Sequence, residues 1–232
     1  MGRVIAISSG DLETTKFINE YAVNMLGGVA GKVLFIGTAS KDAEGYIASM
    51  GDAFGQLGCE LKALKLVAQS YTDAEIKALL SWANIIYVGG GDTIFMINTW
   101  KKYGLDVLLK DIYQSDGAIL MGISAGAMCW FQCGCTDSEL AAKPAGSSYG
   151  WAEDLLNIYP YAYCPHYEDR VEEFSQLMKE KDVVGLAMEC NTAFVEENGQ
   201  FFFLKGNDGG KAYRIKSENG EIMREELHIN AK

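Results

Sequence analysis

The residues best suited to covalent chemistry lie in Gly122–Gly126, which reads Gly-Ile-Ser-Ala-Gly. This segment follows an apolar run and precedes a helix-like stretch, Ala127–Phe131. A serine at a strand-to-helix corner presents its hydroxyl at the end of the strand, and flanking glycines leave room for a tight turn and a substrate. The pattern predicts that Ser124 is a nucleophile. The alternative is a buried serine in a glycine-rich turn.

A serine nucleophile needs a base, and the chain has 2 histidines, His166 and His228. His166 lies in Cys164–Tyr167 (Cys-Pro-His-Tyr), just after a predicted strand, where a loop can return its ring to Ser124. His228 lies near the polar C-terminal segment and is expected to be solvated. We therefore expect His166 to be the general base. An esterase of the α/β-hydrolase type would instead place its histidine near the C-terminus, which would select His228.

A third group must orient the imidazole, and two carboxylates are candidates. Asp137 lies in a polar segment shortly after Ser124, where it can also be a turn-former. Glu189 directly follows the apolar run Val183–Met188. An acid in that place falls at the ligand-binding edge of an α/β sheet, where Ser124 is also expected. The residues alone leave both candidates open.

The glycine run Gly89–Gly91 also follows a predicted strand, and Asp92 and Thr93 lead into a predicted helix. Backbone amides in such a run can bind an anion or stabilise a developing oxyanion. The run lacks the Lys-Ser/Thr ending of a phosphate-binding loop and the spacing of a dinucleotide fingerprint. A source of oxyanion donors is therefore the favoured interpretation.

A zinc site is a weaker interpretation of one group of residues. The residues concerned are Cys133, Cys135, Cys164 and His166. Their spacing matches no known zinc finger, and apolar neighbours explain the thiols as small core residues. We expect no metal and no cofactor.

The elements around these residues alternate between short β-branched runs and amphipathic stretches. Strands are predicted at Arg3–Ser8, Lys32–Gly37, Leu61–Leu66, Asn84–Val88 and Ala118–Ile123. Helices are predicted from the capping box at Thr72 to Trp82, from Thr93, and over Leu105–Gln114. Such alternation is typical of parallel strands joined by crossover helices.

The regular alternation of predicted strands and helices ends at about residue 159. The predicted elements are a strand at Tyr159–Tyr163, a helix at Glu168–Glu180, a strand at Val183–Met188, and antiparallel ribbons at Thr192–Glu196, Gln200–Lys205 and Lys211–Lys216. Asn198-Gly199 and residues 207–210 supply the hairpin turns. The expected fold is an α/β three-layer sandwich over residues 1–232, with a mostly parallel central sheet and C-terminal antiparallel hairpins.

Composition excludes several classes of protein. The chain has 232 residues, 49% hydrophobic and 22% charged, which excludes collagen-like and disordered proteins. A formal charge of -11 disfavours nucleic-acid partners. The apolar runs are too short for a signal peptide or a membrane span. We expect a cytoplasmic protein, monomeric or homodimeric, whose 6 cysteines are reduced.

Four motifs occur together and in a familiar order. They are Gly89–Thr93, Gly122–Ala127, Cys164–Tyr167 and Glu189–Ala193. In these the chain resembles the dipeptidase E (aspartyl dipeptidase) family of serine peptidases, to which cyanophycinase is related. The resemblance implies a fold like that of class I glutamine amidotransferases, with serine in place of the amidotransferase cysteine.

The resemblance also implies roles for single residues. Ser124 is similar to the family's nucleophile and His166 to its base. Glu189 is similar to the third member, although Asp137 matches an acid also implicated there. The oxyanion-hole amides implied by the resemblance belong to Gly90 or Gly91 together with Ala125.

Two departures bear on the substrate. Asp92 stands where the family's glycine run usually ends in Asn, and it puts negative charge beside the site. The segment after His166 looks short, and Arg170 is the match to an arginine that holds the carboxylate of an N-terminal Asp. This points to a less-characterised branch of the family. We expect a serine hydrolase that cleaves short peptides through an acyl-enzyme, with dipeptides beginning in Asp as one substrate class. The alternatives are an esterase and a noncatalytic ligand-binding member.

Overall fold

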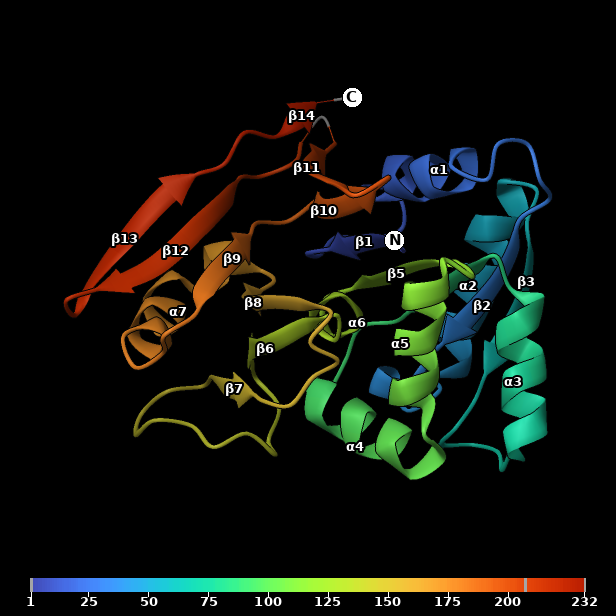
Figure 1. Ribbon diagram of the computed structural model, residues 1–232, viewed down its shortest axis with the longest axis horizontal. Coiled ribbons are helices and arrows are strands. Elements are labelled where there is room, and N and C mark those ends of the chain that lie inside the picture. Colours follow the sequence, from blue (N-terminus) through green and yellow to red (C-terminus); the bar gives the residue numbers. More distant parts are fainter. Residues whose placement is uncertain (1, 207, 232) are drawn as a thin grey trace.

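Two β-sheets organise the chain in a computed structural model that describes residues 2–206 and 208–231 (Figure 1). The larger is an eight-stranded sheet with the order β14-β11-β10-β1-β5-β4-β2-β3. Its parallel strands are β1 (Arg3–Ile7), β2 (Lys32–Ile36), β3 (Glu60–Leu64), β4 (Ile85–Val88) and β5 (Ile119–Ile123). The strands β10 (Thr192–Glu197), β11 (Gln200–Lys205) and β14 (Asn230–Ala231) extend it beyond β1.

Helices cover both faces of this sheet, because its central strands are apolar on both sides. The helices are α1 (Lys16–Asn24), α2 (Glu44–Gln56), α3 (Asp73–Trp82), α4 (Thr93–Tyr103) and α5 (Leu105–Ser115). Buried residues of α1 and α2 share one core with Ile5 and Ile7 of β1. Buried residues of α3, α4 and α5 share another with Val4 and Ala6. The expected three-layer α/β architecture is confirmed.

A second, six-stranded sheet has the order β13-β12-β9-β8-β6-β7. Its strands are β6 (Phe131–Thr136), β7 (Gly150–Ala152), β8 (Tyr159–Cys164), β9 (Val184–Met188), β12 (Ala212–Glu218) and β13 (Glu221–Glu226). The helix α7 (Val171–Met178) packs on it in a third core with Cys135 and Cys164. Phe131, Tyr159 and Tyr163 join the core beneath the larger sheet, so the two sheets are packed together.

Three local predictions differ from the structure. Only Ala125–Met128 (α6) is helical after the serine, and Phe131 begins β6. The helix predicted at Glu168–Glu180 is the shorter α7, because His166 has left-handed backbone angles and a single 3-10 turn separates it from the helix. The C-terminal ribbons are divided: β10–β11 extend the larger sheet, and β12–β13 extend the smaller.

Two predicted local signals are seen in the backbone. Thr72 and Glu75 form the reciprocal capping box at the start of α3. Asn198 and Gly199 have φ of 54° and 73°, which a tight hairpin turn between β10 and β11 requires. The turn predicted at 207–210 includes Asn207, which lies outside the described residues. Over the described residues, no helix is long and apolar enough to cross a membrane.

Candidate active site

Ser124 occupies a sharp bend between β5 and α6. Its φ of 54° and ψ of −114° are unusual for a residue other than glycine. The bend needs glycine on each side: a Cβ on Gly122 would lie 2.2 Å from the Gly126 carbonyl oxygen, and one on Gly126 would lie 2.1 Å from Val88 O. Strand and helix therefore approach closely enough to hold the Ser124 hydroxyl at the carboxyl edge of the sheet.

The hydroxyl of Ser124 meets the ring of His166. Ser124 Oγ lies 3.0 Å from His166 Nε2, within hydrogen-bond distance. The two residues come from different sheets, since Ser124 follows β5 and His166 follows β8. His166 has φ of 53°, which turns the chain back toward the serine. His228, the alternative base, is exposed between β13 and β14. The structure brings His166 to the serine, and not His228.

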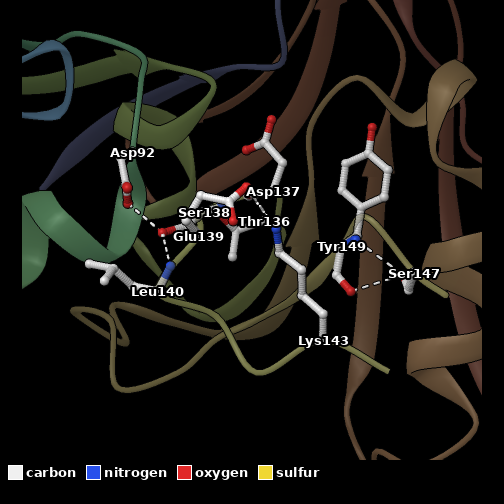
Figure 2. A network of polar contacts seen from close by, with 9 residues as sticks. All are labelled: Asp92, Thr136, Asp137, Ser138, Glu139, Leu140, Lys143, Ser147 and Tyr149. Atoms are coloured by element: carbon white, nitrogen blue, oxygen red, sulfur yellow. Dashed lines mark hydrogen bonds and ion pairs between the residues drawn. The ribbon is translucent and has the colours of Figure 1, made fainter. Parts of the chain in front are cut away.

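A cavity of about 550 Å³ opens over this pair. It is lined by Gly91, Asp92, Ser124, Asp137, Ser138, Glu139, Tyr149, His166, Asp169 and Arg170. Its walls come from the start of α4, from the segment between β6 and β7, and from the turn before α7. Ser138 Oγ donates to Asp92 Oδ1 at 2.7 Å and ties two of these walls together (Figure 2).

The two candidate third groups lie in different surroundings. Asp137 lines the cavity, and its carboxylate points away from the Asp92–Ser138 contact (Figure 2). Lys143 Nζ donates to the Asp137 carbonyl at 2.9 Å. Glu189 Oε2 instead accepts from the Lys211 amide at 2.8 Å. Among the described residues, no carboxylate oxygen hydrogen-bonds to the His166 ring.

Comparison with known proteins shows the family of the chain. A sequence profile of peptidase family S51 matches residues 4–204. The chain belongs to peptidase family S51. The uncharacterized peptidase YgaJ of Bacillus subtilis (strain 168) is 32% identical to it over 230 residues, which cover 96% of this chain and 95% of YgaJ. The match confirms the resemblance to the dipeptidase E family and identifies a serine peptidase.

Solved structures show the same fold. A peptidase from an acI-B1 Actinobacterium superposes with a TM-score of 0.72 at 18% identity, over 98% of this chain and 97% of that one. A putative peptidase E protein from Listeria monocytogenes EGD-e superposes with a TM-score of 0.66 at 21% identity, over 88% of this chain and 98% of that one. The arrangement of the two sheets is thus shared with peptidases solved by crystallography.

The surroundings of His166 in this S51 chain lower its pKa below the usual 6.5. Burial of the ring is the largest cause, and the positive charge of Arg170 acts in the same direction. The carboxylates of Glu168, Asp169 and Asp137 oppose the shift. The net effect keeps the imidazole neutral near pH 7, the form that can accept a proton from the Ser124 hydroxyl.

Backbone amides of the kind that can stabilise an oxyanion lie near Ser124. A Cβ on Gly90 would lie 3.4 Å from Ser124 Cβ, so the Gly90 backbone packs against the serine. The Gly90 amide makes a long contact of 3.5 Å with the Tyr46 hydroxyl. Gly91 lines the cavity with φ of 137°, and Ala125 directly follows the serine as the first residue of α6. Gly90 therefore packs against Ser124, Gly91 lines the same cavity and Ala125 adjoins the serine in the chain.

Arg170 is buried at the wall of the cavity. The residue is only 7% exposed to solvent. Arg170 Nη1 donates to the Cys135 carbonyl at 3.0 Å, and the guanidinium lies 4.8 Å from the centre of the Tyr149 ring. Its Nε has no hydrogen-bond partner among the described residues. The guanidinium is thus held in place by Cys135 and Tyr149, and its buried Nε lacks a partner among the described residues.

Some residues of this S51 site were missed in the sequence. Ser8 follows β1 and bonds to the backbone of His166, while Ser138 and Tyr149 help to form the cavity wall. Ser8 carried a usable signal, because a polar residue directly after a parallel strand lies at the same sheet edge as Ser124. Ser138 and Tyr149 lie in an irregular segment, where sequence gives no such guide.

The cysteines near the site are packed as core residues. Burial raises the pKa of the Cys133 thiol to about 11, and it raises that of Cys164 as well. Thiols in this state are poor metal ligands and poor nucleophiles. Among residues 2–206 and 208–231, no cluster of three or more His, Cys, Asp or Glu side chains has a geometry that could hold a metal ion.

Proposed function

We propose that this S51 peptidase hydrolyses short peptides with Ser124 as nucleophile and His166 as general base. The observation that carries the proposal is the 3.0 Å contact between Ser124 Oγ and His166 Nε2, placed at a strained bend in the floor of a cavity. A nucleophile and base within hydrogen-bond reach are the signature of acyl transfer.

The reaction proceeds in two halves. Ser124 Oγ attacks the peptide carbonyl while His166 Nε2 takes the hydroxyl proton, and the amides of Gly90, Gly91 and Ala125 stabilise the oxyanion. Collapse of this intermediate breaks the C–N bond, and protonated His166 gives its proton to the leaving amine. A water molecule then attacks the ester with His166 again as base, which releases the acid and restores Ser124.

Asp137 is our choice for the third group. It lies in the same cavity as His166, and its negative charge acts on that ring. Glu189 has its Oε2 occupied by the Lys211 amide and does not line the cavity. A carboxylate that faces the imidazolium stabilises it during the reaction, directly or through a water molecule.

The size of the cavity favours small substrates. Its volume of about 550 Å³ is in the range of sites that enclose small ligands rather than long chains. A preference for peptides that begin with Asp is a second, finer candidate, carried by the guanidinium of Arg170 in the wall of the cavity. The cavity also contains the carboxylates of Asp92, Asp137, Glu139 and Asp169, which oppose such a preference.

Two measurements test the proposal. Wild-type protein is treated with a fluorophosphonate probe, and labelling at Ser124 is located by mass spectrometry, with His166→Ala as the control for activation. A panel of dipeptides and an aryl ester are then assayed. Labelling together with peptide cleavage is expected. Ester cleavage without peptide cleavage would favour the esterase, and no labelling of folded protein would favour a noncatalytic binding role.

A further inference from the structure

Ser124 and His166, together called the dyad from here on, come from two different sheets. A specific contact must therefore hold the two side chains at the right distance from each other. Ser124 belongs to the larger sheet through β5, and His166 belongs to the smaller through β8. Displacement of a catalytic group by about 1 Å can cost on the order of a hundredfold in rate. The residue that joins the two sheets at this point is Ser8, directly after β1.

Ser8 bonds to both halves of the dyad. Its carbonyl oxygen accepts from the Ser124 amide at 3.1 Å, and its hydroxyl oxygen accepts from the His166 amide at 3.0 Å. The same hydroxyl donates to the Met188 carbonyl at 2.6 Å, at the end of β9. The Ser8 amide donates to the Thr192 carbonyl at 2.9 Å. One residue thus bonds to the backbone of the nucleophile, of the base and of two neighbouring strands.

The chemistry of this position requires a hydroxyl. The Ser8 oxygen must accept from one backbone group and donate to another, which a hydroxyl can do and an alanine methyl cannot. Ser8 is 0% exposed, so its hydroxyl bonds to protein groups and not to bulk solvent. His166 has φ of 53°, a conformation that non-glycine residues keep only when their surroundings hold it. The bond from its amide to Ser8 restrains this point of the chain, together with the bond from the Asp169 amide to the His166 carbonyl.

We propose that Ser8 is a positioning residue that holds the His166 ring against Ser124. Ser8 does not line the cavity, so it acts through His166 and not on the substrate. The inference rests on the proposed function, because it assigns Ser8 to the same dyad.

The chain offers a matched control in Ser9. Ser9 is also buried, at 2% exposed, but its hydroxyl donates to Cys190 Sγ at 2.8 Å and, over the part of the chain that the structure describes, forms no hydrogen bond with His166. Ser8→Ala and Ser9→Ala therefore remove the same atom from neighbouring positions. We expect Ser8→Ala to lower kcat about 10- to 100-fold with KM within about twofold of wild type. Ser9→Ala is expected to leave kcat within about twofold.

A second readout does not depend on turnover. With only 2 histidines in the chain, the ring nitrogen signals of His166 can be followed by NMR in histidine-labelled protein, with His228→Gln for assignment. Wild type and Ser9→Ala should show a His166 pKa below 6.5. In Ser8→Ala the ring gains access to water, and its pKa should move up toward 6.5. Thermal unfolding checks that the variants are folded. If Ser8→Ala does not fold, Ser8→Cys replaces it, because cysteine is similar in size to serine and forms weaker hydrogen bonds.

The outcomes separate the two proposals. If His166 titrates alike in Ser8→Ala and Ser9→Ala, the positioning role is wrong, whatever the activity. If only Ser8→Ala shifts the titration while the wild-type protein cleaves no peptide, Ser8 positions the histidine and the proposed hydrolysis is wrong. Equal losses of kcat in both variants would also overturn the positioning role, because a general loss of packing would then explain them.

Discussion

Two buried polar clusters lie near opposite ends of β1, and they are built differently. At the carboxyl end, Ser8, Ser124 and His166 surround the dyad. Toward the other end, Glu196 of β10 pairs with Val4 of β1, is 0% exposed, and accepts hydrogen bonds at Oε2 from the hydroxyls of Tyr113 and Tyr159. One cluster opens on a cavity, and the other is closed over by core side chains.

The two clusters differ in how they shift the pKa values of their ionisable groups. The tyrosines beside Glu196 remain neutral donors, since burial and the nearby carboxylate raise the pKa of Tyr113 to about 12 and raise that of Tyr159 further. At the dyad, burial lowers the pKa of His166 and leaves it ready to accept a proton. Under the proposed function the dyad serves reaction and the Glu196 cluster serves stability, so variants in each should change different properties.

Removal of the proposed nucleophile should have the largest effect. Ser124→Ala is expected to reduce kcat by about 10⁴-fold or more, because the covalent step is lost. Stability should change by no more than about 0.5 kcal/mol, since the side chain is partly exposed at the floor of the cavity. Steady-state kinetics and urea unfolding measure the two quantities. Cleavage at the wild-type rate by Ser124→Ala would end the proposed mechanism.

The third group gives the next largest effect. Asp137→Asn is expected to reduce kcat by roughly 10²- to 10⁴-fold, because the amide cannot stabilise the imidazolium as a carboxylate does. Glu189→Gln is the matched control: its amide oxygen can still accept from Lys211, and kcat should stay within about threefold. Parallel kinetics on the two variants decide the assignment. The reverse order of effects would assign the role to Glu189.

In the closed cluster the expected loss is one of stability. Glu196→Ala leaves the buried Tyr159 hydroxyl and the half-buried Tyr113 hydroxyl without their acceptor, and the free energy of unfolding should fall by about 3 kcal/mol. Glu197→Ala, one position along β10, removes a half-buried carboxylate that accepts from Tyr21 at 2.5 Å, and should cost about 1 kcal/mol. Urea unfolding and kcat are measured for both. A large fall in kcat with unchanged stability in Glu196→Ala would show that the two clusters are coupled.

The two clusters also differ in how far sequence could predict them. The strands and the bend at Ser124 follow from local patterns, and His166 was selected because the chain has so few histidines. Glu196 sits beside Glu197 in a predicted ribbon, with nothing to show that one is buried. Its burial depends on Tyr113 and Tyr159, which come from distant segments. Long-range contacts of this kind have no local signature in the sequence.

The same reason explains what was missed at the site. The strands β6 and β7 contain glycines and small residues, which do not give the sequence pattern typical of a strand. Their place in the smaller sheet depends on β8, β9 and the hairpin β12–β13. The choice between Asp137 and Glu189 depends on the path of an irregular segment, which local propensity does not fix. Positions set by strand ends were predictable, whereas positions set by loops were not.

The lowered pKa of His166 predicts the pH dependence of turnover. The base must be neutral, so kcat/KM should fall about tenfold per pH unit below the folded-state pKa and be level above it. Because burial and Arg170 place that pKa below 6.5, the acidic limb should have its midpoint under 6.5. A pH–rate profile with a nonspecific dipeptide measures it. A midpoint above 6.5 would mean that the nearby carboxylates outweigh burial at the dyad.

Arg170 should give the smallest effect, one of selectivity. If its guanidinium binds a substrate carboxylate, Arg170→Ala should lower kcat/KM for Asp-Leu about tenfold more than for Ala-Leu. The variant also loses a charge that lowers the His166 pKa, so its acidic limb should move upward. Both substrates must therefore be compared near pH 8, where the imidazole is neutral in both proteins. Equal losses for the two dipeptides would leave Arg170 only its contacts with Cys135 and Tyr149, and the carboxylates of the cavity would then dominate substrate choice.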